Sequence, residues 1–328
     1  MTDPAAFYEA VREEAGTVLI GNEEIIRSLS ISALTGGHVL LEGVPGGAKT
    51  TIANLFARAS GLEFHRIQMT PDILAADITG THIYRESTGE FELQRGPIFA
   101  NVVVADEINR ATPKTQSALL EAMQEGTVTI EGETLSLPDP FMVIATQNPI
   151  EMEGTFALPE AQRDRFQFKL TIDLPNRDSE RRLLDRFDAE PGLGPSSIEQ
   201  VVTPAELAAA REAVTEVHVA DPVREYILDV VRATRNSPDV EYGASPRASL
   251  AFLNAGKAAA AVDGRDYVIP DDVKRLAHPI LRHRLVLSTD AELGGESVED
   301  LITGFLETVP VPDDVGRDGE PIEATAED

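Results

Sequence analysis

Apolar residues in the first half of the chain fall into short runs, separated by longer segments with helical periodicity. Four such runs end near polar or glycine-rich positions, at residues 38–44, 62–68, 101–107 and 141–148. Runs of this kind are typical of strands buried in a parallel sheet. The segments around them predict helices over 3–15, 23–34, 51–59 and 113–124. This alternation predicts an α/β fold built on a parallel sheet.

The pattern changes after Pro175-Asn176, where strand signals become rare. Before that point, two segments predict β-hairpins, around 83–93 and 128–137. Beyond it, helices are expected over 177–188, 204–218, 221–236, 245–262, 270–284 and 297–308. From Pro310 onward, Pro, Gly and acidic residues dominate, which is typical of a disordered tail. We therefore expect an α/β domain over 1–175, an all-helical domain over 176–309 and an acidic tail over 310–328.

The glycine-rich turn after the first apolar run is the first candidate site. Residues Gly43 to Thr50 end that run and lead into the helix predicted over 51–59, which is the layout of a phosphate-binding P-loop. Lys49 would reach the phosphates, and the Thr50 hydroxyl would help to hold Mg²⁺. The consensus has glycine where this chain has Ala48, a change that is tolerated if the residue has helical φ. The alternative is an ordinary glycine-rich turn between a strand and a helix.

Polar residues follow two further apolar runs. Asp106 and Glu107 end the run at 101–107, and Asn148 ends the run at 141–148. The carboxyl ends of parallel strands are where α/β sheets bind ligands. Asp106 therefore suits the Mg²⁺ shell and Glu107 suits polarising an attacking water, while Asn148 could orient that water. A P-loop followed by such an acid pair fits ATP hydrolysis.

Arginines mark two other places of interest. Arg163 and Arg165 precede the apolar run from Phe166 to Leu174. In Ser245-Pro246-Arg247, serine is expected as the N-cap and proline at the first helical position. A base in the first turn opposes the helix dipole, which makes sense if Arg247 faces an anion.

Composition narrows the function classes. The chain has 56 acidic and 28 basic residues and a formal net charge of −28, which disfavours direct binding to nucleic acid. It has no cysteine, which excludes disulfides and thiolate metal sites. No apolar run is long enough to span a bilayer, and no signal-peptide pattern opens the chain, so a cytoplasmic protein is expected. We also hypothesise that this acidic, lysine-poor surface works in a high-salt cytosol, where screening suppresses self-repulsion.

Taken in order, these motifs resemble those of the MoxR family of AAA+ ATPases. Residues Gly43–Thr50, with Ala48, resemble that family's P-loop variant. Ala105–Ala111 resemble its Walker B segment and Ala145–Pro149 its sensor 1 strand. Leu158–Phe166 resemble its arginine-finger segment and Ser245–Arg247 its sensor 2. The resemblance covers about residues 5–308, and the two predicted hairpins fall where the family carries insertions.

The resemblance implies a P-loop AAA+ domain followed by a helical lid, with ATP and Mg²⁺ as cofactors. Ile20 and Gly21 would border the adenine, and the phosphates would be held by Gly46, Gly47, Ala48, Lys49, Thr50 and Thr51. Thr50 and Asp106 would bind the metal, and Glu107 would be the general base. Asn148 would position water, and Arg247 would sense the γ-phosphate. Arg165 would act on the nucleotide of a neighbouring subunit, which implies a homo-oligomeric ring, expected to be a hexamer.

The leading functional hypothesis is an ATP-hydrolysing, chaperone-like remodeller of partner proteins. The resemblance suggests clients with von Willebrand factor A domains. One alternative is a nucleotide-gated binding module with slow turnover, which needs the same site. Another is a nucleic-acid motor, which the excess of acidic residues disfavours.

Overall fold

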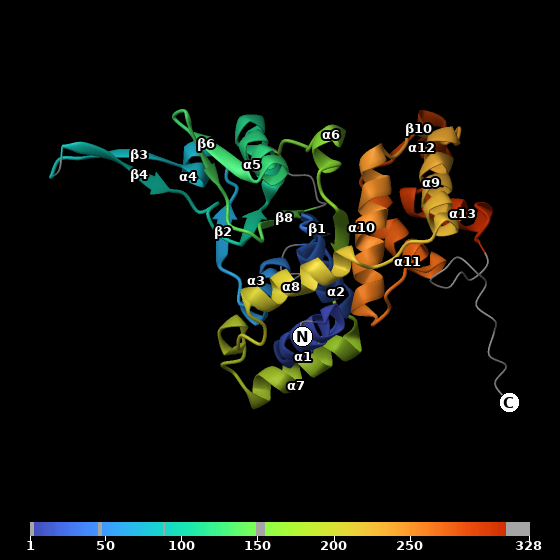
Figure 1. The fold of residues 1–328 in the computed structure, drawn as a ribbon, viewed down its shortest axis with the longest axis horizontal. Coiled ribbons are helices and arrows are strands. Elements are labelled where there is room, and N and C mark those ends of the chain that lie inside the picture. Colours follow the sequence, from blue (N-terminus) through green and yellow to red (C-terminus); the bar gives the residue numbers. More distant parts are fainter. Residues whose placement is uncertain (1–2, 45–47, 88, 149–154, 313–328) are drawn as a thin grey trace. The chain divides into compact units, whose positions relative to one another are not determined.

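The computed structural model describes residues 3–44, 48–87, 89–148 and 155–312 (Figure 1). Its contacts divide the chain into two compact units, one over Glu9–Leu207 and one over Ala208–Asp328 together with the first eight residues. The divisions fall within helices α1 (Pro4–Val18) and α8 (Pro204–Thr215). The predicted domain boundary at residue 175 stays a prediction.

The first unit is built on a five-stranded parallel sheet with strand order β2-β5-β8-β1-β9. The strands are β1 (Val39–Gly43), β2 (Phe64–Gln68), β5 (Val102–Asp106), β8 (Met142–Gln147) and β9 (Phe168–Ile172). All residues of the interior strand β5 are buried, which explains its almost unbroken apolar sequence. The four predicted strands are confirmed. The fifth, β9, comes from the apolar run at 166–174, whose structure the sequence left open.

Helices cover both faces of this sheet. On one face, Val103 and Ala105 of β5 join an apolar cluster with Leu119 and Leu120 of α5 (Pro113–Glu125). Because side chains alternate along a strand, the neighbouring residues of β5 point to the other face, where α3 packs. The remaining helices of this unit are α2 (Glu23–Thr35), α3 (Lys49–Ala59), α4 (Ala75–Thr79), α6 (Glu160–Arg163) and α7 (Arg177–Ala189).

Both predicted hairpins are present. β3 (Gly80–Arg85) pairs with β4 (Glu90–Arg95), and β6 (Thr127–Ile130) pairs with β7 (Glu133–Ser136). Figure 1 shows β3 and β4 as a long arm that extends away from the sheet. Glycine is required at its base, because Gly80 has φ 100° and a Cβ there would lie 2.2 Å from the carbonyl oxygen of Gln94. The aromatic rings of Tyr84 and Phe91 pair on this arm, and both are exposed.

The second unit is mainly helical, as the periodicity predicted. Its helices after α8 are α9 (Asp221–Asn236), α10 (Pro246–Val262), α11 (Pro270–Leu281), α12 (Thr289–Gly294) and α13 (Val298–Thr308). Two features were not predicted: the short helix α12, and an antiparallel pair of strands, β10 (Val240–Tyr242) with β11 (Val286–Leu287). The helix expected over 270–284 ends at Leu281 and the one expected over 204–218 ends at Thr215.

A buried histidine ties the amino end of β1 to its neighbours. The Nε2 atom of His38 lies 2.9 Å from the carbonyl oxygen of Met123, and the backbone N–H of Val143 donates to Nδ1 at 3.0 Å. Nδ1 is thus an acceptor and Nε2 carries the proton, which is the neutral form of the ring. Burial lowers the pKa of His38 to about 4, although the bond to Met123 acts in the opposite direction.

In the part of the chain that the structure describes, none of the helices combines the length and hydrophobicity that crossing a bilayer requires. Most of the predicted acidic tail lies outside the described residues. Its disorder therefore stays a prediction.

Candidate nucleotide-binding and catalytic site

Lys49 and Thr50 are the first two residues of helix α3. The Nζ atom of Lys49 donates to the carbonyl oxygens of Gly43 at 2.6 Å and of Val44 at 3.0 Å. Desolvation lowers the pKa of Lys49, while the negative charges of Asp106 and Glu107 act in the opposite direction. Gly46 and Gly47, predicted to hold phosphate, lie outside the described residues.

Ala48 corrects one expectation from the sequence. A right-handed helical φ would have made its methyl group harmless, but the residue has φ 60° and ψ 14°, which is the left-handed region. An alanine there is strained by about 1–2 kcal/mol, because Cβ approaches the backbone too closely. The methyl group itself is exposed, so it meets no packing obstacle. Ala48 thus replaces the consensus glycine at a position whose left-handed φ favours glycine.

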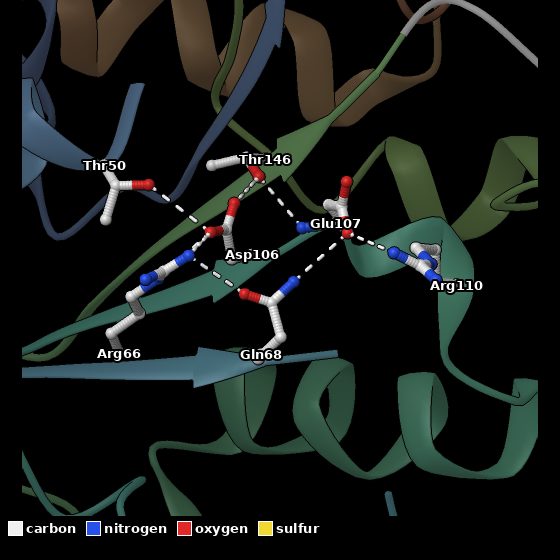
Figure 2. Close-up of polar contacts among 7 residues, drawn as sticks. All are labelled: Thr50, Arg66, Gln68, Asp106, Glu107, Arg110 and Thr146. Carbon is white, nitrogen blue, oxygen red and sulfur yellow. Dashed lines mark hydrogen bonds and ion pairs between the residues drawn. The ribbon is translucent and has the colours of Figure 1, made fainter. Parts of the chain in front are cut away.

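Asp106 ends β5 and is buried. Its Oδ1 atom accepts a hydrogen bond from Thr146 Oγ1 at 2.5 Å, and its Oδ2 atom lies 3.4 Å from Thr50 Oγ1 (Figure 2). Arg66 of β2 also binds Oδ2, through Nε at 3.0 Å and through Nη2. Burial alone would raise the pKa of Asp106. The hydrogen bonds from Thr146, Arg66 and Thr50 and the charge of Arg66 outweigh it, so this pKa lies below its ordinary value.

Glu107 follows in the left-handed conformation, with φ 56° and ψ 53°. Its backbone N–H donates to Thr146 Oγ1 at 2.9 Å, which holds the turn that leads into the 3-10 helix Ile108–Arg110. The carboxylate oxygen Oε2 accepts from Gln68 Nε2 at 3.1 Å and from Arg110 Nη1 at 2.8 Å. Backbone strain of this kind, held by surrounding bonds, is found preferentially at functional sites.

Four residues at this site were missed by the sequence reasoning: Arg66, Gln68, Arg110 and Thr146. Two of them belong to β2, where Gln68 lies opposite Asp106 in the parallel register. Because side chains alternate along a strand, Arg66 and Gln68 lie on the same face. Polar residues alternating within a predicted strand were the available signal. Their meaning depended on the pairing of β2 with β5, which local sequence does not specify.

The other predicted residues are spread more widely. Asn148 directly follows β8, the strand next to β5. Arg165 is half-buried, and its Nη1 atom donates to the carbonyl oxygen of Leu120 in α5 at 2.7 Å. Arg247 belongs to the second unit, in the first turn of α10, where Ser245 forms the predicted N-cap by accepting from its backbone N–H. The roles expected of Asn148, Arg165 and Arg247 stay predictions.

A largely apolar cavity of about 330 Å³ lies beside the P-loop turn. Ile20, Ala48 and Thr51 line it, together with Leu55 of α3 and Phe187 of α7. Gly21 is not among its lining residues. It borders a second, more polar cavity of about 300 Å³ that shares Leu19 with the first. The first cavity offers an apolar surface of the kind that flat heterocyclic rings occupy.

The residues at the strand ends fit a magnesium ion. Asp106 and Thr50 present a carboxylate and a hydroxyl oxygen, the hard donors that Mg²⁺ prefers. Among the described residues, no group of three or more His, Cys, Asp or Glu side chains could cage a metal.

Comparisons with known proteins show which family this chain resembles. Residues 38–168 match a family described as "ATPase family associated with various cellular activities (AAA)", and residues 232–304 match the AAA lid domain. The chain is 45% identical to Chaperone MoxR1 of Mycobacterium tuberculosis, over 91% of this chain and 81% of that protein. It is also 45% identical to the uncharacterised protein YeaC of Bacillus subtilis, over 92% and 93% of the two chains. A crystal structure of a candidate ATPase from Cytophaga hutchinsonii has a TM-score of 0.86 and 40% identity, covering 94% of this chain and 97% of its own.

Proposed function

The chain belongs to the MoxR family of AAA+ ATPases, and on that premise we propose that it hydrolyses ATP at the carboxyl ends of β1, β5 and β8. It is a chaperone-like AAA+ ATPase, so the proposed turnover serves to remodel partner proteins. The observation that carries the proposal is the meeting of Thr50 and Asp106 across 3.4 Å, with Glu107 as the next residue of the chain.

In the proposed mechanism, the triphosphate lies along the P-loop turn and its base enters the apolar cavity lined by Ile20 and Thr51. Lys49 turns from the carbonyl oxygens of Gly43 and Val44 towards the phosphates. Thr50 and Asp106 would hold Mg²⁺, which would neutralise phosphate charge when bound.

Glu107 is the proposed general base, and it accepts the proton of the attacking water. Its bonds from Gln68 and Arg110 fix the direction of the carboxylate. Asn148, at the end of the neighbouring strand, is proposed to orient the same water.

Two arginines are proposed to act on the γ-phosphate from outside this strand cluster. Arg165 would serve the nucleotide of a neighbouring subunit, which requires it to leave the carbonyl oxygen of Leu120. Arg247 would sense the γ-phosphate from the first turn of α10. An arginine supplied in trans implies a homo-oligomeric ring, which we propose to be a hexamer.

The β3–β4 hairpin is the proposed contact with client proteins. The rings of Tyr84 and Phe91 contact each other and are still 54% and 69% exposed, so they offer an apolar surface to another protein. We propose that its clients are proteins with von Willebrand factor A domains. The proposed location is the cytoplasm, where ATP is available.

The decisive test is Glu107→Gln, which removes the base but keeps the shape of the side chain. We expect phosphate release to fall by about 10²-fold or more. ATP–Mg²⁺ should still raise the melting temperature, because the phosphate and metal ligands are intact.

Glu125→Gln is the matched control, since it makes the same change on an exposed residue at the end of α5, and it should leave turnover unchanged. Near-wild-type phosphate release by Glu107→Gln would refute the role of that residue. No thermal response of the wild-type protein to ATP–Mg²⁺ would refute the proposed function as a whole.

A further inference from the structure

An arginine occupies the carboxylate oxygen that the proposed metal would use. Oδ2 of Asp106 faces Thr50 Oγ1 at 3.4 Å, and Arg66 donates to this same oxygen through Nε at 3.0 Å and through Nη2. The other oxygen, Oδ1, is engaged by Thr146 at 2.5 Å. Figure 2 shows that Arg66, from strand β2, and Thr50, from helix α3, both point at Asp106. A cation that binds between Thr50 and Asp106 therefore meets a guanidinium already in place.

The two positive groups cannot share this oxygen at low cost. A guanidinium and a divalent ion both need the lone pairs of Oδ2, and like charges a few ångströms apart repel each other. The partners also differ in freedom, because the side chain of Arg66 is 50% exposed while that of Asp106 is only 10% exposed. When a metal arrives, Arg66 can withdraw into water, whereas the carboxylate is held in place by Thr146 and the end of β5.

We propose that Arg66 competes with Mg²⁺ for Oδ2 of Asp106 and so sets the Mg²⁺ concentration at which the nucleotide site is loaded. This inference rests on the proposed function, because it takes Asp106 as the metal ligand. Arg66 is a positioning residue here, since it acts on the metal through the carboxylate.

The competition also reaches Glu107. Nη2 of Arg66 donates to Gln68 Oε1 at 2.9 Å, and the amide nitrogen of the same glutamine donates to Glu107 Oε2 at 3.1 Å. When Arg66 leaves Asp106, Gln68 loses the partner that fixes its orientation. Binding of the metal at Asp106 is therefore expected to change the hydrogen bonding of the Glu107 carboxylate as well.

The test is a titration of metal rather than of activity. The protein is saturated with a non-hydrolysable ATP analogue at fixed ionic strength, and the melting temperature is followed as free Mg²⁺ is raised. For Arg66→Gln, we expect the Mg²⁺ midpoint to fall about tenfold, equivalent to about 1.4 kcal/mol of released competition. Arg66→Lys keeps the positive charge, so its midpoint should stay near that of the wild type.

Arg85→Gln provides the matched control, because it removes an arginine that pairs with exposed Glu92 on the hairpin, away from Asp106. Its midpoint should equal that of the wild type. An unchanged midpoint in Arg66→Gln would overturn the competition. So would a fall in nucleotide affinity measured in EDTA, which would make Arg66 a phosphate ligand instead. If the wild-type protein shows no response to nucleotide and Mg²⁺ at all, the proposed function fails, a result distinct from failure of the Arg66 role.

Discussion

Within the described part of the chain, two buried aspartates, Asp106 and Asp272, are each paired with an arginine, and the two pairs are built differently. In the second unit, Arg265 grips both oxygens of Asp272, with Nη1 at 2.8 Å from Oδ2 and Nη2 at 2.7 Å from Oδ1. Oδ2 also accepts from the backbone N–H of Ile269 at 3.0 Å, which caps α11. In the first unit, Arg66 holds a single oxygen of Asp106 and is itself half-exposed.

The Asp272–Arg265 pair is enclosed by the fold, whereas the Asp106–Arg66 pair can separate because its arginine reaches water. The side chain of Asp272 is 1% exposed and that of Arg265 is 23% exposed, so neither group can return to water without local unfolding. The hydrogen bonds and charge of Asp272 raise the pKa of Arg265. In the Asp106 pair, the side chain of Arg66 is half-exposed. Arg66 can therefore leave the carboxylate and be replaced by another cation.

The largest expected loss of stability comes from removing the carboxylate of Asp272, which is paired with Arg265. Asp272→Ala leaves Arg265 without its main partner in a confined place, so the free energy of unfolding should fall by about 3 kcal/mol or more. Asp106→Asn should change it by about 1 kcal/mol or less, because the amide can still bond with Thr146 and Arg66 can turn to water. Urea unfolding in concentrated KCl measures both. Equal losses in the two variants would show that the Asp106 pair is as structural as the other.

The same contrast separates the two ends of strand β1. At its carboxyl end lie the strained Ala48 and the displaceable contacts of Lys49, and at its amino end lies His38, bonded on both ring nitrogens. A second proton on His38 would point Nδ1–H at the N–H of Val143, which the fold cannot accommodate. Burial lowers the pKa of His38 from 6.5 to about 4 in the folded protein.

The pH dependence of stability tests the role of His38 at the amino end of β1. Because the folded pKa is the lower one, the unfolded chain binds the proton first, and stability is full above pH 6.5 and lost as the pH falls from 6.5 to about 4. A difference of this size corresponds to at most about 3 kcal/mol. We expect His38→Gln to flatten the dependence of unfolding free energy on pH in this window. Identical slopes for wild type and variant would mean that other groups cause the loss.

Burial made three strands easy to predict, although the less buried edge strand β2 was predicted as well. The strands β1, β5 and β8 are enclosed by helices on both faces, so their apolar runs were unmistakable. The edge strand β9 alternates instead, with Lys169 paired to Glu42 of β1 at 2.9 Å, and its sequence gave no comparable signal. The pair β10–β11 spans too few residues for any periodicity to appear.

The same limit applies to the site. Lys49, Thr50, Asp106 and Glu107 could be predicted because each belongs to a local motif whose spacing carries its meaning. Arg66 and Thr146 reach Asp106 only because β2, β5 and β8 are neighbours in the sheet, and strand order is a property of the whole fold. The left-handed φ of Ala48 was also hidden, since alanine is the residue for which helical φ is the usual expectation.

The smallest effect tests whether the open end of β1 stores strain. Ala48→Gly should raise the free energy of unfolding by about 0.5–1 kcal/mol, because glycine adopts φ 60° freely while its greater freedom in the unfolded chain cancels part of the gain. Ala209→Gly is the matched control, since Ala209 is exposed within α8, where the same substitution should cost about 1 kcal/mol. Opposite signs in urea unfolding would locate strain at the P-loop turn. If both variants lose stability, Ala48 is relaxed, and the contrast between the two ends of β1 rests on the hydrogen bonds of His38 alone.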